Sequence, residues 1–161
     1  QCYNGQIAVD EDSQLIVATA LTNNAADNNE LLPLLDEALS NLGKDPEQLL
    51  ADAGYRSEAN FEALETRNID AYVSLGREGK KAPTVATTPA SQRMEAKLAR
   101  ESGKKRYRRR KAIVEPVFGW IKGVLGFRRF SFRGKEKTEQ EWSLVCLAVN
   151  LKRFHVLQAT G

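Results

Sequence analysis

Two kinds of apolar pattern alternate along this chain, and their order limits the folds open to it. Residues 3–9 and 14–21 are short runs of β-branched and apolar side chains, separated by Asp-Glu-Asp-Ser, which predicts a β-hairpin. Beyond Asp27, leucine and alanine recur at helical spacing, with Pro33 in the first turn and Gly43 closing the helix.

The alternation continues through the next segments. Residues 49–51 predict a short strand that ends at Asp52. Ser57 fits the N-cap of a helix over residues 57–67, and residues 71–75 predict another strand. The order strand–strand–helix–strand–helix–strand predicts an α/β fold with a mixed sheet flanked by helices.

The second half of the chain is expected to be largely helical. A flexible insertion is expected at about 77–105, because Gly, Lys, Pro and Thr without apolar periodicity open it, although residues 91–102 look helical. Further helices are predicted over residues 112–125 and roughly 136–157. Pro116 removes a backbone donor, so either the first of these kinks there or a new helix starts beside it.

Charge is divided unequally between the two halves of the 161 residues. Residues 1–92 hold 6 Lys/Arg and 15 Asp/Glu, a net charge of −9, whereas residues 93–161 hold 18 and 6, a net charge of +12. The basic half, which includes the run KKRYRRRK at 104–111, predicts a surface for a polyanion. No apolar run approaches the roughly 20 residues of a membrane span.

The residues available as metal ligands are few. His155 is the single histidine, and Cys2 and Cys146 lack the spacing of a metal site, so a metal would have to be held by carboxylates. Asp52 and Glu115 are the candidates. As alternatives, Asp52 could serve only an Asx-type turn before Gly54, and Glu115 could serve only a surface salt bridge to a neighbouring lysine. Together with the basic run, however, two carboxylates on separate elements match the needs of phosphodiester chemistry.

Four stretches carry a family resemblance. In this order and spacing, YNGQIAVD, QLIVATALTNNAADN, LLADAGYRS and IVEPVFGWIK resemble the catalytic domain of DDE transposases from bacterial insertion sequences. The resemblance covers nearly the whole chain, and its most specific parts are DAGY after a strand and the glutamate followed by Pro-x-Phe-Gly. It implies that residues 1–161 are the C-terminal part of a single ribonuclease-H-like domain that lacks its first strand.

The same resemblance implies an activity, cofactors and partners. The enzyme would cut DNA at transposon ends and join the freed 3′-hydroxyl to target DNA, using two divalent cations, Mg²⁺ or Mn²⁺. Its partner would be double-stranded DNA, bound by a homodimer, in the cytoplasm at the bacterial nucleoid.

Roles for individual residues follow from the resemblance as well. Asp52 would be the second catalytic acid and Glu115 the third, both as metal ligands. The family's tyrosine–arginine–glutamate–lysine signature fits at Glu115 and Lys122, but has Lys111 in place of arginine and Arg108 in place of tyrosine. The DNA-binding residues are then expected to be Lys111, Lys122, Tyr107, Arg108, Arg109 and Arg110.

The first catalytic acid and the extent of the chain are open points. Asp10 and Asp27 are candidates for that acid within the chain, but we expect it upstream of Gln1. Because the chain starts at Gln1 and has one methionine, Met94, we expect it to be a piece of a longer protein and inactive alone.

Two other functions compete with the transposase. One is a degenerate transposase that binds DNA without cutting it. The other is an RNA-binding domain that uses the basic run, although no aromatic-rich sheet motif supports it. Trp120 or Trp142 could stack on an extruded base, and Trp120 is the better candidate because it falls away from the apolar helix face.

Overall fold

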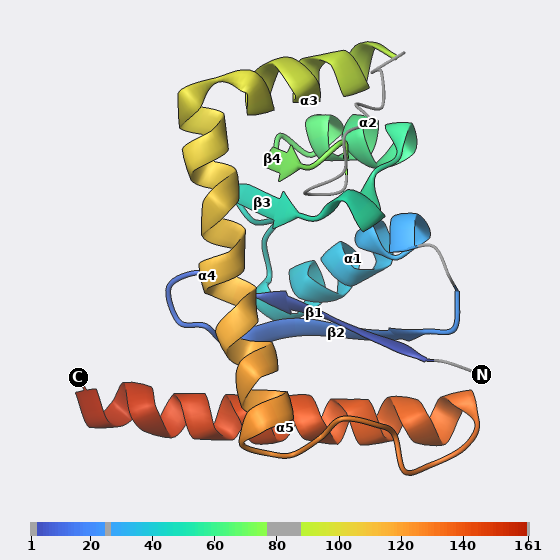
Figure 1. Cartoon of the computed structure of the whole chain (residues 1–161), viewed down its shortest axis with the longest axis vertical. Coiled ribbons are helices and arrows are strands. Elements are labelled where there is room, and N and C mark those ends of the chain that lie inside the picture. The colour runs from blue at the N-terminus through green and yellow to red at the C-terminus, as the bar shows by residue number, and fades with distance from the viewer. Residues whose placement is uncertain (1–2, 25–26, 77–87, 161) are drawn as a thin grey trace. The chain divides into compact units, whose positions relative to one another are not determined.

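A computed structural model describes residues 3–24, 27–76 and 88–160 of the chain (Figure 1). These residues belong to two compact units. Unit 1 consists of Gln1–Asn24, Leu34–Leu42 and Lys111–Gly161, and unit 2 of Ala25–Pro33 and Gly43–Arg110. Within the described ranges the fold is α/β, with five α-helices and two small sheets.

Unit 1 is built on the predicted hairpin. Strands β1 (Asn4–Val9) and β2 (Ile16–Thr22) pair antiparallel, with an irregularity between Ala8 and Val9. In the connecting turn the carboxylate of Asp10 accepts hydrogen bonds from the N–H and hydroxyl of Ser13, at 2.8 and 2.6 Å. The hairpin prediction is therefore confirmed.

Helix α5 (Lys135–Thr160) packs against β2 and carries the centre of the unit 1 core (Figure 1). The Trp142 ring is buried and its Nε1–H donates to the carbonyl of Gln6 at 3.1 Å. Gly5 lies directly under that ring, because a Cβ added there would come within 2.8 Å of Trp142 Cε2. A glycine in β1 thus lets the indole approach the backbone of the hairpin.

Two further helices contribute to this unit. Helix α1 (Leu31–Leu42) has Pro33 in its first turn and is followed by Gly43 at φ +74°, as predicted. Helix α4 (Glu101–Gly123) runs without interruption through Pro116, so of the two alternatives at Pro116 a new helix start is wrong. The helix ends at Gly123, two residues earlier than predicted, and Val124, which follows it, is 67% exposed.

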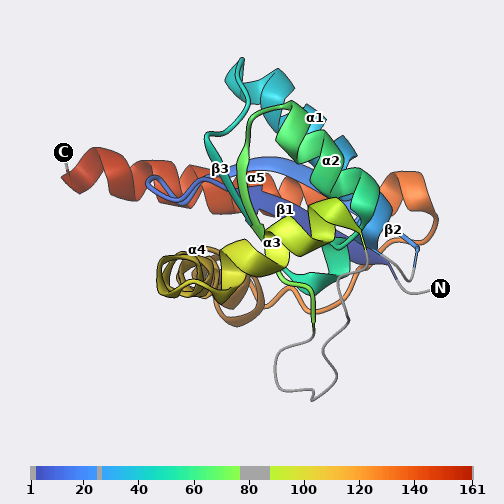
Figure 2. The ribbon, with the colours of Figure 1, turned by 90° about the horizontal axis from the view of Figure 1, so that it is seen from above.

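Unit 2 contains the parallel strands β3 (Gln48–Ala51) and β4 (Asp70–Val73), with Leu49 opposite Ala71. Helices α2 (Glu58–Thr66) and α3 (Pro89–Ala99) lie side by side against β4 (Figure 2). The short 3₁₀ helices are η1 (Asp27–Asn29) and η2 (Ala53–Tyr55). Among the largest fully buried side chains of unit 2 are Phe61, Leu64 and Val73.

The strands form two pairs rather than the one mixed sheet that we expected. Among the described residues β1 pairs with β2 and β3 with β4, and no ladder joins one pair to the other. Alternation of apolar residues reports which face of a strand is buried, not which strand lies next to it, so the sequence could not separate these arrangements.

The expected insertion at about 77–105 lies partly outside the described residues, which resume at Thr88. Its later part is helical: the stretch expected to be helical falls largely in α3, and the basic run 104–111 lies within α4.

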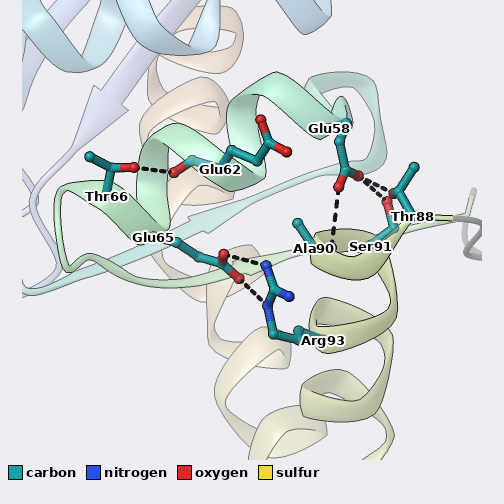
Figure 3. Close-up of polar contacts among 8 residues, drawn as sticks. All are labelled: Glu58, Glu62, Glu65, Thr66, Thr88, Ala90, Ser91 and Arg93. Carbon is teal, nitrogen blue, oxygen red and sulfur yellow. Dashed lines mark hydrogen bonds and ion pairs between the residues drawn. The ribbon is translucent and has the colours of Figure 1, made fainter.

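The carboxylate of Glu58 in α2 caps the start of α3 (Figure 3). It accepts hydrogen bonds from the Thr88 hydroxyl, from the Ser91 hydroxyl at 2.9 Å and from the Ala90 N–H at 3.2 Å. Thr88 is the N-cap residue of α3 but makes no capping bond with its own side chain. Glu58 therefore satisfies donors that the helix start leaves open.

These hydrogen bonds predict a pH-dependent stability. They hold the pKa of Glu58 below its ordinary value of 4.5, with the bond from Thr88 contributing most. A carboxyl whose pKa falls on folding stabilises the fold above its ordinary pKa and loses that contribution as the pH falls through the lowered value. Glu58→Gln should therefore lower the free energy of unfolding at neutral pH, and the difference from wild type should shrink below pH 4.5. Urea unfolding over this pH range measures it, with Glu62→Gln on the same helix as control. A difference that does not change with pH would contradict the role of the Glu58 charge.

The contact between Gly5 and Trp142 predicts a second stability effect. Gly5→Ala should destabilise the protein by about 1–3 kcal/mol, because the added Cβ overlaps a buried ring. Gly119→Ala, within α4 and with nothing within 4 Å of its added Cβ, should instead stabilise it by about 0.5–1 kcal/mol. Thermal unfolding of both variants measures the two effects. Equal changes in stability would show that the Trp142 ring does not limit the space beside Gly5.

Candidate active site

Asp52 stands at the end of β3, where the chain turns into η2. Its backbone is extended, with φ −81° and ψ 178°, and its Oδ1 accepts a hydrogen bond from the Gly54 N–H at 2.9 Å. The side chain is exposed, and Oδ2 makes no hydrogen bond within the described part of the chain. Asp52 thus does serve the turn, but with one oxygen only.

Two carboxylates approach Gly54 closely. A Cβ added at Gly54 would lie 3.0 Å from Asp27 Oδ2 and 3.0 Å from Asp52 Oδ1. Asp27, at the start of η1, is therefore brought to the same side of Gly54 as Asp52. This explains the glycine in LLADAGYRS.

The pKa of Tyr55 reflects the negative charges that surround this turn. Burial raises the pKa of its hydroxyl, and the charges of Asp27, Asp52 and Glu30 raise it further. Three carboxylates from two segments of unit 2 are therefore close enough to act on one tyrosine. Repulsion between such groups would be relieved by a bound cation.

Asn60 joins these two segments, and sequence reasoning missed it. It is 3% exposed, and its side-chain amide donates to the carbonyls of Asn28 and Tyr55, both at 2.7 Å. One buried amide thus ties η1 to the turn after Asp52. The sequence places it on the apolar side of α2, beside Phe61 and Leu64, and a polar residue there is the signal that could have revealed it.

Glu115 lies on the part of α4 that belongs to unit 1. Its side chain is exposed, and within the described residues it makes no ion pair, so the salt bridge to Lys111 or Lys122 considered from the sequence is not formed. The Lys122 ammonium instead lies 5.6 Å from the centre of the Phe118 ring. Glu115 and Lys122 line a groove of about 1030 Å³ in unit 1, together with residues of the segment 124–134 that follows α4.

The basic run occupies the preceding part of α4. Arg108 and Arg109 are exposed, and the Arg110 guanidinium lies 5.5 Å from the centre of the Tyr107 ring. Lys111 is exposed at the first position of this helix that belongs to unit 1. The expected DNA-binding residues thus lie on one helix and present several charges to solvent.

The structure groups these residues in two sets. Asp52 lies with Asp27 in unit 2, and Glu115 lies with Lys122 in unit 1. Within the ranges described, no cluster of three or more His, Cys, Asp or Glu side chains is arranged to hold a metal ion. The carboxylate oxygens of Asp52 and Glu115 are nevertheless the donor type that Mg²⁺ and Mn²⁺ prefer.

Other candidates from the sequence have structural roles. Asp10 closes the hairpin turn through Ser13, whose hydrogen bonds lower the pKa of that carboxyl. Trp142 is 4% exposed in the unit 1 core, so it cannot stack on a base. Trp120 packs half-buried against the same core, which corrects the expectation that it points away from the apolar face.

Comparison with known proteins adds a match over most of the chain. A family model for the transposase DDE domain matches residues 1–151. The chain belongs to the transposase DDE-domain family. No curated protein and no solved structure matches it.

Family membership supports a transposase function for this chain. The match includes Asp52, Glu115 and the whole basic run of the DDE domain. None of the described helices combines the length and apolar character that crossing a membrane requires.

The turn geometry predicts how substitutions at Asp52 affect stability. Asp52→Asn should leave the free energy of unfolding almost unchanged, because an amide oxygen can still accept from the Gly54 N–H. Asp52→Ala should lower it by about 1 kcal/mol through loss of that cap. Denaturant unfolding of both variants measures the difference. Equal destabilisation by Asn and Ala would show that the charge, rather than the cap, is what the fold needs.

Proposed function

We propose that this DDE domain carries out metal-dependent DNA strand cleavage at transposon ends and strand transfer to target DNA. The proposal rests on two acids, Asp52 and Glu115, that lie within the residues matched by the family model. Asp52 has an oxygen without a hydrogen bond at a strand end, and Glu115 is exposed without an ion pair, within the described residues. Both acids are exposed, so each keeps carboxylate oxygens that a ligand from solvent can reach.

Asp52 and Glu115 would hold the divalent ions, Mg²⁺ or Mn²⁺. When bound, two such ions activate a water molecule and stabilise the leaving oxygen of a phosphodiester. The cap from the Gly54 N–H fixes the carboxylate of Asp52, and the buried Asn60 fixes the turn behind it. Asp10 would not be a further metal ligand, because its carboxylate already serves the hairpin turn.

Lys122 and the basic run would position the DNA. Lys122 lines the same groove as Glu115 and would bind a phosphate next to the bond that is cut. The remaining contacts to the phosphate backbone would come from Lys111, Tyr107, Arg108, Arg109 and Arg110. Such contacts give affinity and orientation rather than sequence readout.

The reaction would proceed in two displacements at phosphorus. Water attacks the phosphodiester at the transposon end, a P–O bond forms as the P–O3′ bond breaks, and the 3′-oxygen leaves as a hydroxyl. That 3′-hydroxyl then attacks a phosphodiester of the target and displaces a second 3′-hydroxyl.

The fold and the assembly complete the proposal. We propose that this α/β domain is ribonuclease-H-like, as its family resemblance implies. The enzyme would act as a homodimer on double-stranded DNA at the nucleoid in the cytoplasm.

Nicking of a supercoiled plasmid in Mn²⁺ by the complete protein tests the function. Asp52→Asn and Glu115→Gln should each lower the rate at least about a hundredfold, since even the outer partners of metal ligands cost ten- to a hundredfold when removed. Both variants should keep their DNA affinity in EDTA.

Matched controls are Glu62→Gln in unit 2 and Glu136→Gln in unit 1, both exposed acids on helices. These controls should nick at the wild-type rate. Retained nicking by Asp52→Asn would remove Asp52 from the mechanism. A complete protein that binds DNA but never nicks it would support a degenerate transposase instead.

A further inference from the structure

The segment between α4 and α5, residues 124–134, contains three arginines interspersed with three phenylalanines, and we call it the arginine loop. Phe127 and Phe130 turn inward: their ring centres lie 5.3 Å apart, and each lies 6.2 Å from a ring of Trp142. Arg128, Arg129 and Arg133 are exposed. The loop therefore anchors itself to the core with aromatic rings and presents guanidinium groups outward.

The arginine loop is also held by its backbone. The Phe127 N–H donates to the carbonyl of Ile121 at 3.0 Å, which ties the loop to α4. The N–H groups of Ser131 and Phe132 donate to the carboxylate of Glu141 on α5, at 2.9 and 3.1 Å. A loop fixed at three points loses little conformational entropy when a ligand binds it.

The three arginines face the groove that contains Glu115. With Lys122 they bring four cationic side chains to its lining, and among the described residues Glu115 is the one acid there. In the same part of the chain none of the three arginines forms an ion pair. Cations gathered without acidic partners fit a ligand that carries several negative charges.

Phe132 adds a different type of contact. It lines the same groove but is 57% exposed, whereas its neighbours Phe127 and Phe130 are half-buried in the core. An exposed aromatic ring beside arginines combines a stacking face with phosphate contacts, which is how proteins bind single-stranded nucleic acid.

We propose that the arginine loop binds the single-stranded DNA end that lies at Glu115. Arg128, Arg129 and Arg133 contact its phosphates, and Phe132 stacks on an unpaired base. The proposal deepens the proposed function, because it takes the DNA to be the strand that the acids cut. It assigns to unit 1 a binding site for an unpaired end, separate from the basic run of α4, which would bind the duplex.

Binding measured in EDTA tests the loop without cleavage. The probes are a fluorescent DNA duplex with a single-stranded 3′ tail and the same duplex with blunt ends. Phe132→Ala should weaken binding of the tailed probe by about 5- to 100-fold and leave the blunt probe unaffected. Phe132→Tyr, which keeps a ring, should retain wild-type affinity.

The arginines are tested through the salt dependence of binding to a short single strand. Arg128→Ala with Arg129→Ala should reduce the slope of log affinity against log salt by about 1.4, or 0.7 for each phosphate that the loop no longer neutralises. The matched control is Lys137→Ala with Lys152→Ala, which removes the same charge from exposed positions of α5. This control should leave the slope close to wild type.

The outcomes separate this proposal from the proposed function. An equal change of slope in both double variants would overturn the loop contacts, because net charge alone would explain it. The loop proposal would also fail if Phe132→Ala weakened both probes alike, or if its effect appeared with RNA and not with DNA. If the arginine loop variants bind as wild type does while Glu115→Gln abolishes nicking, the loop proposal fails and the proposed function stands. If instead Glu115→Gln nicks at the wild-type rate while the loop variants lose affinity for the tailed probe, the proposed function fails and the loop still binds single-stranded DNA.

Discussion

The groove of unit 1 depends on which side of α4 faces the core. Val117 and Ile121, 5% and 2% exposed, are one turn apart and fix which side of the helix faces the core. At about 100° per residue, Glu115 and Lys122 then fall on the opposite side. The burial of two aliphatic side chains therefore places an acid and a lysine together in solvent. Pro116 does not disturb this, because the helix continues through it.

In the segment LLADAGYRS, residues 49–57, a second constraint is the close approach of the Asp27 and Asp52 carboxylates to Gly54. A turn acid and a catalytic acid are often treated as alternatives, but Asp52 has an oxygen for each role. The hydrogen bond to Gly54 orients the carboxylate, and the oxygen that remains can bind a ligand. Structural use of Asp52 is therefore compatible with the proposed catalytic use, since a metal ligand must be held in a defined orientation.

Much of the local structure could be predicted because it depends on neighbouring residues. The hairpin, the helix closed by Gly43 and the N-cap at Ser57, whose side chain accepts from the Asn60 N–H at 3.1 Å, all follow from short-range patterns. The pairing of strands could not be predicted, because period-two alternation is the same for any neighbour. Asn60 and the turned-in rings of Phe127 and Phe130 were missed for a related reason, since their partners lie far along the chain or depend on a loop conformation.

For the candidate site, the sequence located the acids but not their surroundings. The basic run drew attention to α4, whereas the arginine loop, with fewer charges, lines the groove beside Glu115. Trp120 and Trp142 were the stacking candidates, Trp120 the better one for its place away from the apolar helix face, yet both pack against the core. Exposure, which distinguishes Phe132 from them, is a property of the folded chain.

The central claim is that Asp52 and Glu115 serve one metal-dependent reaction. A crystal structure of the chain grown with Mn²⁺ and a short DNA duplex tests this most directly, because anomalous scattering locates manganese without ambiguity. The account predicts manganese at carboxylate oxygens of Asp52 and at those of Glu115. Two carboxylates that face different surfaces, with no manganese at either, would contradict it and leave Asp52 as a turn residue of a DNA-binding protein.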